Sequence, residues 1–462
     1  MKTYDLIVIG GGPGGYVAAI RGSQLGLKVA LVEKDKLGGV CLNWGCIPTK
    51  SLIKNAEVIS LLNEGKSFGF TFDKSSLKVD YGAAQERSRQ VSAKLVKGIE
   101  YLIKKNNIEL YTGVAVLKDH TKVEIQPQGE IIEGKNIIIA TGSRASLIPG
   151  VKADAENILT ARRALELKKL PSKMIIVGAG AIGMEFAHIW SSYGVDVTIV
   201  EMAADVLPLE EKEVSAEVRK NFEKRGIKIL TRTKVVKIES DSIGVTISVA
   251  NDNKNEVLKS DMMLLSAGVK PNSEDLGLEK LSIKMERGYI IIDEYMCTSI
   301  TGIYAIGDVT GKMPLAHVAS AQGIIAVEKI AGNEPRTLNY ANMPRCTYCH
   351  PETASVGLTQ AQALEKGYTL KIGNFPFQAN GKAISIGETA GFVKIIAEAK
   401  YGEILGVHMV GSHVTEMIAG PTGLIALEAT VEELANIVHP HPTLSEVIME
   451  AAHAVEGKAI HI

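Results

Sequence analysis

Two cysteines stand five positions apart near the N-terminus, in the segment Gly38–Lys50. Cys41 and Cys46 are near enough in the chain to close a small ring, and a short exposed disulfide is readily reduced and suits thiol–disulfide exchange. A structural disulfide and one half of a metal site are the alternatives that this spacing leaves open. No second C-x-x-C or histidine pair follows nearby to complete tetrahedral zinc ligation, so we expect redox chemistry and no metal.

A glycine-rich loop precedes the cysteines. Its order is an apolar strand, a glycine turn, a helix and a second apolar strand, over residues 5–9, 10–15, 16–25 and 28–33. At G-x-G-x-x-G spacing, Gly10 permits a tight turn, Gly12 lets the backbone approach a pyrophosphate, and Gly15 lets the helix pack on the strand. The helix N-terminus favours phosphate, and Glu33 can bind a ribose diol.

The same design occurs a second time, with Gly178, Gly180 and Gly183 between strands at 173–177 and 196–200. In both copies an acid, Glu33 or Glu201, lies eighteen residues beyond the third glycine. Two matching copies predict two dinucleotide sites, and hence a flavin and a nicotinamide that exchange electrons. A carboxylate at Glu201 suits the free 2′-hydroxyl of NAD and repels the 2′-phosphate of NADP, so we expect NAD.

The composition is that of a soluble globular protein of about three domains. Of 462 residues, 46% are apolar, and 51 basic side chains balance 52 acidic ones, which argues against a nucleic-acid partner. The longest charge-free stretches, 6–20 and 313–327, are too short to span a membrane. A strand pattern from Tyr4 leaves no room for a signal peptide, and five cysteines suit a reducing compartment, so we expect a cytoplasmic protein.

The segment 38–50 resembles the redox-active disulfide segment of the pyridine nucleotide-disulfide oxidoreductases. Four later segments are similar to this family's first FAD turn, the exit from its NAD domain, its second FAD motif and its catalytic His–Glu segment: 140–143, 266–272, 298–309 and 439–446. The resemblance implies an α/β fold with two Rossmann-like dinucleotide-binding domains plus a C-terminal α+β dimerisation domain. The divisions expected are an FAD domain, an NAD domain, a central segment that completes the FAD site, and an interface domain: 1–145, 146–270, 271–338 and 339–462.

The resemblance also implies roles for the cysteines and for a base. Cys41 is expected to form the mixed disulfide with substrate, and Cys46 to be the thiolate that faces the flavin. Exchange needs a base because the thiolate is the nucleophile, and His441, oriented by Glu446, is expected to serve. His439 is expected to support the structure.

Further residues are expected at the two cofactors by the same resemblance. Lys50 is expected near the flavin, paired with Glu185 of the NAD domain, and Asp308 at the ribityl chain. The other residues expected at FAD are Lys34, Gly39, Gly113, Thr141, Gly142, Ser143, Leu315, Ala316 and His317. The other residues expected at NAD are Val235 and Gly268.

Within the family, the resemblance is greatest to members that oxidise dihydrolipoamide on a lipoyl carrier and pass the electrons to NAD. It implies lipoyl domains of 2-oxo acid dehydrogenase or glycine cleavage complexes as partners. His441 lies almost four hundred residues from Cys46, and by resemblance it completes the site of a second subunit, which implies a homodimer. A docked binding subunit with dispensable catalysis is the alternative from another functional class.

Other segments favour structural interpretations. Residues 346–350 match the C-x-x-C-H pattern of haem attachment, but they align with the start of the family's dimerisation domain, so Cys346 and Cys349 are expected to be small buried residues. The mixed-charge run 210–224 predicts a solvated helix face, and 251–259 a polar hairpin turn. Strands are expected at 392–397 and 404–410.

Overall fold

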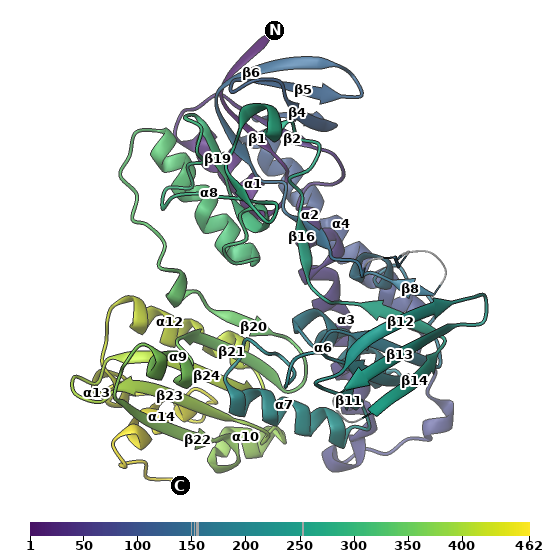
Figure 1. The fold of residues 1–462 in the computed structure, drawn as a ribbon. Helices are drawn as coiled ribbons and strands as arrows, with labels where there is room; N and C mark the ends of the chain where they lie inside the picture. The colour runs from purple at the N-terminus through teal and green to yellow at the C-terminus, as the bar shows by residue number, and fades with distance from the viewer. Residues whose placement is uncertain (149, 152, 154–156, 252–253) are drawn as a thin grey trace.

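The computed structural model describes residues 1–148, 150–151, 153, 157–251 and 254–462. Figure 1 shows three lobes: one near the N-terminus, one carrying the β12–β14 sheet, and one that ends with the C-terminus. None of the helices in the described ranges is long and apolar enough to cross a membrane.

The first lobe is built on a seven-stranded sheet of order β3-β2-β1-β6-β5-β4, with β19 paired to β6. Strands β1, β2, β3, β6 and β19 run parallel, whereas β4 and β5 form an antiparallel edge. The strand bounds are Lys2–Ile9, Val29–Glu33, Glu109–Thr112, Val114–Leu117, Lys122–Gln126, Glu130–Ile139 and Ile303–Ala305 for β1 to β6 and β19. The centre of β1 is fully buried, as a continuous apolar run in a covered parallel sheet requires.

Helices α1 (Pro13–Gln24) and α8 (Ala316–Ile330) pack against each other on this sheet. Two further helices, α3 (Cys46–Asn63) and α4 (Tyr81–Lys105), extend from this lobe toward the second one (Figure 1). The short α2 (Gly39–Trp44) immediately precedes α3. The cysteine segment is therefore part of a helical bridge between two lobes.

The second lobe repeats the parallel design. Its sheet has the order β11-β10-β9-β15-β8, and all its pairs are parallel. The bounds of β8 to β11 and β15 are Ile158–Leu159, Lys173–Val177, Asp196–Val200, Lys228–Leu230 and Met262–Leu265, and helix α6 spans Ala181–Ser192. Strands β9 and β10 have the bounds that the sequence predicted.

An antiparallel sheet, β12-β13-β14, packs its apolar face against β9 and β15 through one shared cluster. Its strands are Lys234–Ser240, Val245–Asn251 and Lys254–Ser260. The expected polar turn at 251–259 is therefore wrong at 251, which ends strand β13, and at 254–259, which lie in strand β14. Positions 252 and 253 lie outside the described residues. The chain joins this lobe to the first through a two-stranded sheet of β7 (Ser143–Ala145) and β16 (Val269–Pro271).

The third lobe is an antiparallel sheet of order β20-β21-β24-β23-β22. Its strands β20 to β24 span Arg345–Thr347, Glu352–Gly357, Leu370–Pro376, Phe392–Glu398 and Ile404–Gly411. Its main helices, α10, α12, α13 and α14, span Gly381–Ile386, Ala419–Ala426, Val431–Asn436 and Glu446–Val455. The two strands expected from the sequence are β23 and β24, and α14 packs on β22 and β23.

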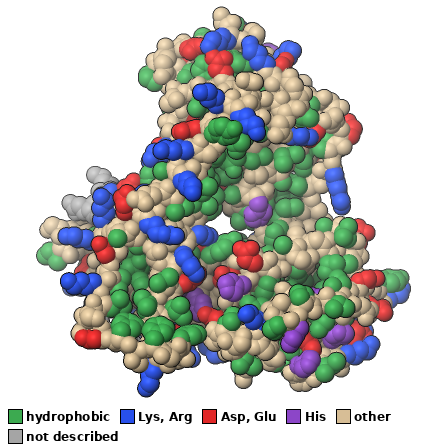
Figure 2. Space-filling view, turned by 180° about the vertical axis from the view of Figure 1, so that it is seen from behind, with side chains coloured by type: hydrophobic (Ala, Val, Ile, Leu, Met, Phe, Trp, Pro, Cys, Tyr) green, Lys and Arg blue, Asp and Glu red, His purple; other side chains and the backbone are tan. Residues whose placement is uncertain are grey.

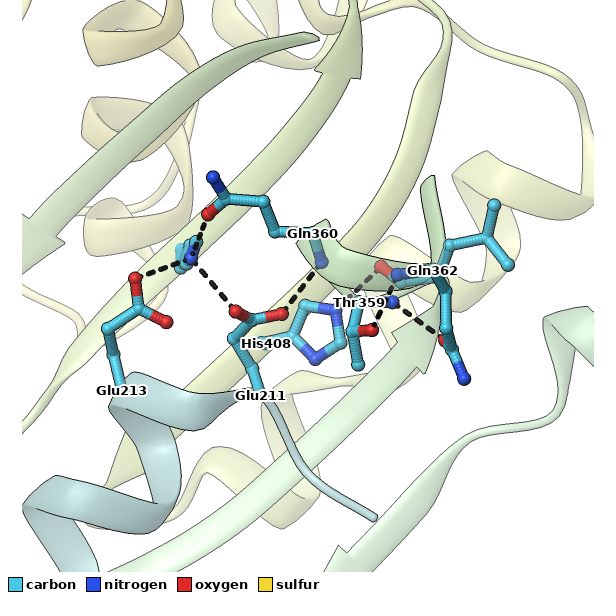
Figure 3. A network of polar contacts seen from close by, with 8 residues as sticks. Glu211, Glu213, Thr359, Gln360, Gln362 and His408 are labelled. Atoms are coloured by element: carbon cyan, nitrogen blue, oxygen red, sulfur yellow. Dashed lines mark hydrogen bonds and ion pairs between the residues drawn. The ribbon is translucent and has the colours of Figure 1, made fainter. Parts of the chain in front are cut away.

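Strand β23 carries a buried cation, Lys394, whose partners Glu211, Glu213 and Gln360 lie together in one network of polar contacts (Figure 3). Lys394 is 1% exposed, and its Nζ lies 3.1 Å from Oε1 of Glu211, 2.7 Å from Oε1 of Glu213 and 2.8 Å from Oε1 of Gln360. Glu213 lies in α7 (Lys212–Lys224), and Glu211 is the residue before it. The expected solvated face is thus wrong at Glu211, which is buried because it neutralises Lys394 between the second and third lobes.

We expect Lys394→Met to lower the free energy of unfolding by about 3 kcal/mol, because it leaves the Glu211 carboxylate buried without its cation. The midpoint of urea unfolding measures this loss. The matched control is Lys371→Met on the neighbouring strand, where an exposed pair with Glu456 is lost and the midpoint should barely move. Adding Glu211→Gln to Lys394→Met should recover part of the loss, and a double variant as unstable as the single one would contradict this explanation.

Candidate active site

The two cysteines lie on either side of a break between helices. Cys41 is in α2, Cys46 is the first residue of α3, and Gly45 breaks the helix between them with a backbone that is neither helical nor extended (φ −149°, ψ −113°). The structure holds both as free thiols, which is the reduced form of the pair. A thiolate at Cys46 faces the free N–H groups at the start of α3, where a negative charge is favoured.

The surroundings of the pair favour a charge on one sulfur over the other. The Cys41 thiol hydrogen-bonds to the Cys46 sulfur, and this contact, helped by Lys50 against the opposing effects of burial and Glu185, lowers the pKa of Cys46 to about 7. The same hydrogen bond, together with burial, raises the pKa of Cys41 well above its usual range. The reduced pair can therefore hold a thiolate on Cys46 and a thiol on Cys41 near neutral pH.

A part-buried ion pair supports this arrangement. Lys50 lies one turn beyond Cys46 in α3, and its Nζ is 2.8 and 2.9 Å from the two carboxylate oxygens of Glu185 in α6. Glu185 also accepts a hydrogen bond of 3.1 Å from the backbone N–H of Tyr348, whose ring centroid lies 4.3 Å from Lys50 Nζ. The expected pairing of Lys50 with Glu185 is present, and the participation of Tyr348 carried no sequence signal beyond its match to the family pattern.

The first glycine loop has the shape of a pyrophosphate cradle. Gly10 has φ +105°, and a Cβ on Gly15 would stand 1.8 Å from the carbonyl oxygen of Gly10. No side chain caps the N-terminus of α1 at Gly12, and a Cβ there would meet nothing nearer than Gly39 Cα, at 4.0 Å. Free backbone donors beside open space fit a dinucleotide.

The second loop reproduces this geometry. Gly178 has φ +107°, and a Cβ on Gly183 would stand 2.0 Å from the carbonyl oxygen of Gly178. The N-terminus of α6 at Gly180 is likewise uncapped and open. Ser266, after β15, hydrogen-bonds to the Gly178 carbonyl at 2.9 Å, and Gly268 follows with φ +107°.

Each acid that follows a loop accepts one backbone N–H from that loop and one from the residue two positions beyond the acid. Glu33 accepts from Gly11 at 2.6 Å and from Asp35 at 2.8 Å. Glu201 accepts from Ala179 at 2.6 Å and from Ala203 at 2.7 Å. The two carboxylates thus stand at equivalent places at the rims of the two cradles. Of the other residues expected there, Lys34 is exposed, and Val235 is half-buried against the apolar cluster of the second lobe.

The expected FAD residues from distant segments converge on the first lobe. Ser143 donates a hydrogen bond of 2.6 Å to Asp308 in η4 (Gly307–Thr310), and burial raises the pKa of that carboxyl group. The backbone N–H of Gly113 donates to the carbonyl of Glu33 at 3.0 Å. Other contacts of this set are Thr141 Oγ1 to the Asn272 carbonyl at 2.7 Å and His317 Nε2 to the Pro344 carbonyl at 3.0 Å. Ala316 is the first residue of helix α8, and Leu315 is the extended residue directly before it.

The expected base dyad is formed in the third lobe. His441 Nδ1 lies 2.9 Å from Glu446 Oε1, and the Thr443 N–H donates to the other oxygen at 2.8 Å. Burial opposes these contacts, but the Thr443 N–H and the imidazole outweigh it and lower the pKa of Glu446. The His441 side chain is 78% exposed. Figure 1 shows α14, which begins at Glu446, in a different lobe from α2.

The two cysteines of the C-x-x-C-H segment differ in burial. Cys349 is buried, as expected, and burial raises its pKa. The expectation is wrong for Cys346, which is only partly buried, because it lies on β20 at the edge of its sheet. Across the described ranges, no cluster of three or more histidine, cysteine or acidic side chains is placed to hold a metal ion.

Two family models match this chain. Residues 4–323 match the pyridine nucleotide-disulphide oxidoreductase model, and residues 343–452 match the dimerisation-domain model of the same group. The chain belongs to the pyridine nucleotide-disulphide oxidoreductase family. As a member of this family it is a flavoprotein disulfide oxidoreductase that uses FAD and NAD. The expected fold class, two Rossmann-like units with a C-terminal dimerisation domain, is confirmed.

Several known proteins are similar to this chain over nearly its whole length. A dihydrolipoyl dehydrogenase of Zymomonas mobilis is 48% identical, with 99% of each chain covered, and one of Bacillus subtilis is 44% identical over the same shares. Among solved structures, LpdA of Mycobacterium tuberculosis matches with a TM-score of 0.90 at 27% identity, covering 98% of this chain and 99% of the other. RclA of Escherichia coli, a flavoprotein disulfide reductase, matches at 0.86 and 25%, covering 98% of this chain and 100% of the other.

In the reduced protein, we expect the ultraviolet absorbance of a thiolate to increase as the pH rises through about 7, because Cys46 loses its proton there. Lys50→Met should move this midpoint to higher pH, since it removes the positive charge that stabilises the thiolate. Cys46→Ser should abolish the step, whereas Cys297→Ser, outside the pair, should leave it unchanged. A midpoint at the ordinary value of a free thiol, about 8.5, would contradict the assignment.

Proposed function

We propose that this chain is an NAD-dependent dihydrolipoyl dehydrogenase that oxidises dihydrolipoamide on a lipoyl carrier. The observation that carries the proposal is the unequal cysteine pair beside the first cradle, with Cys46 favoured as the thiolate. The full-length similarity to curated dihydrolipoyl dehydrogenases supports this choice of substrate. The lipoyl domains of 2-oxo acid dehydrogenase or glycine cleavage complexes are the partners that follow from it.

The exchange step balances between two dithiols. One substrate thiol, deprotonated by His441, attacks Cys41 of the oxidised pair, and the Cys41–Cys46 bond breaks with Cys46 leaving as a thiolate. The second substrate thiol then displaces Cys41, which leaves with one proton. The substrate is oxidised to a cyclic disulfide, and the pair is reduced by two electrons. Bound FAD supplies the two-electron relay from this pair to NAD.

Each neighbouring group has a role in this step. Cys46 is the better leaving group because its pKa is the lower of the two, and a leaving thiol of low pKa departs faster. Lys50, held by Glu185, stabilises the negative charge that the departure creates. Glu446 holds the Nδ1 side of His441 and leaves Nε2 free to take the proton from the substrate.

The base acts on a second subunit in this proposal. The exposure of His441 and its location in a different lobe from Cys41 both favour a homodimer in which each third lobe completes the other subunit's site. The match of 343–452 to a dimerisation domain supports it. The divisions 1–145, 146–270, 271–338 and 339–462 suit this assembly, and the β7–β16 pair lies at the first two boundaries. A cysteine pair that is reduced during turnover suits a reducing compartment, which favours a location in the cytoplasm.

Cys46→Ser should fold and bind FAD but lose dihydrolipoamide oxidation by at least about a thousandfold, because the exchange has no leaving thiolate. The measurement is NADH formation under anaerobic conditions, with NADH-driven reduction of ferricyanide as the control for bound flavin. Cys297→Ser is the matched cysteine control and should keep both activities. Unchanged dihydrolipoamide turnover in Cys46→Ser would refute the assignment of Cys46 as the leaving thiolate.

Glu201→Gln should raise KM for NAD about tenfold, because an amide cannot accept with two charged oxygens at the rim of the second cradle. Initial rates at varied NAD measure the change, and Glu223→Gln, on the exposed face of α7, is the control. An unaltered KM would show that Glu201 does not contribute to binding NAD.

A further inference from the structure

The loop that carries the base, residues 437–445 between α13 and α14, has little regular structure. His439 bonds to the carbonyl of Ile437 at 2.9 Å, and Thr443 Oγ1 donates to the carbonyl of Pro440 at 2.8 Å. Both contacts stay within the base loop and cannot by themselves fix its position on the domain. The buried side chain of Leu444 attaches the base loop to the core of the domain. Apolar burial is not directional, so it does not orient the peptide groups of the loop.

A hydrogen bond from another element reaches the base loop. Asn380, at the start of α10, donates from Nδ2 to the carbonyl oxygen of Thr443 at 3.1 Å. Its Oδ1 accepts from the backbone N–H of Ala383 at 2.9 Å and so caps α10. Because the oxygen must face a donor, the amide can only present its NH₂ group to Thr443.

Asn380 is itself held rigidly. The side chain is 6% exposed, and its backbone N–H donates to the carbonyl of Phe377 at 2.9 Å. Phe377 is fully buried in the core of the third lobe. The amide therefore extends a rigid part of the domain to the base loop.

We infer that Asn380 is a positioning residue for the His441–Glu446 dyad, an inference that rests on the proposed function. Asn380 holds the carbonyl of Thr443, and the N–H of the same residue donates to Glu446 Oε2. Glu446 Oε1 in turn holds the ring of His441. Each link uses one group at a defined distance, so a loss at Asn380 releases the loop and lets the base move from its place.

Asn380→Asp tests this link. Aspartate keeps the oxygen that caps α10 but loses the donor and turns a carboxylate toward the Thr443 carbonyl. Dihydrolipoamide oxidation should fall by about tenfold to a hundredfold, the cost of a base displaced by about 1 Å. NADH-driven reduction of ferricyanide, which does not need the base, should be unchanged. Asn339→Asp is the matched control, because Asn339 also caps a short helix through Oδ1.

Two further measurements keep the inference falsifiable. Asn380→Ser retains a capping hydroxyl, carries no charge and is too short to reach Thr443, so it should reproduce the selective loss if aspartate unfolds the domain. Hydrogen exchange of the amides in 437–445 should become faster in both variants and not in Asn339→Asp. Unchanged exchange, or an equal loss of both activities, would overturn the inference. A wild-type enzyme inactive on dihydrolipoamide would instead refute the proposed function, and the exchange measurement would still decide whether Asn380 holds the loop.

Discussion

The ion pair between Lys50 and Glu185 is the contact on which the arrangement of the site depends. Lys50 comes from the helix that begins with Cys46, Glu185 from the helix of the second glycine loop, and Tyr348 from the third lobe. Glu185 is 6% exposed, and a buried carboxylate is costly unless a cation compensates it. The three lobes therefore meet at a charge pair one helical turn from the reactive sulfur.

This placement links assembly to reactivity. If the second lobe separated from α3, Lys50 and Glu185 would lose each other as partners, and Cys46 would lose the fixed position of the nearby ammonium. The hydrogen bond from Cys41 lowers the pKa of Cys46 the most, and burial opposes it. Lys50 lowers this pKa further while Glu185 raises it, so the ion pair adjusts the thiolate by the difference between two opposing effects. Lys394 at the junction of the second and third lobes repeats the principle away from the site, with two glutamates around one fully buried ammonium.

Much of the fold and of the candidate site could be predicted from local patterns. Strand 173–177 was predicted because a strand buried on both faces needs an apolar run, and strand 196–200 because it repeats the order of elements in the first copy. The turn at Gly10 and the packing at Gly15 were found because each needs a residue without a side chain. Burial at Glu211 was missed because its partner lies 183 residues away, and a charge pattern on one helix carries no information about such a partner. Asn380 gave no signal for the same reason, since its contact is to a carbonyl 63 residues further along.

The cysteine pair and the proposed base, His441, lie in different lobes and differ in exposure. The cysteine pair lies in a partial enclosure beside the first cradle, on the bridge of α2 and α3, where both cysteines are partly buried. A base fixed in the same enclosure would add a further titrating group to the environment of Cys46, whose pKa already depends on Cys41, Lys50 and Glu185. In the proposed function, His441 is exposed on a separate lobe, so it would take the proton of a substrate thiol without adding a charge next to Cys46. Because His441 is exposed, burial does not fix its position. Hydrogen bonds to backbone groups of its loop, such as those at Thr443, hold it in place instead.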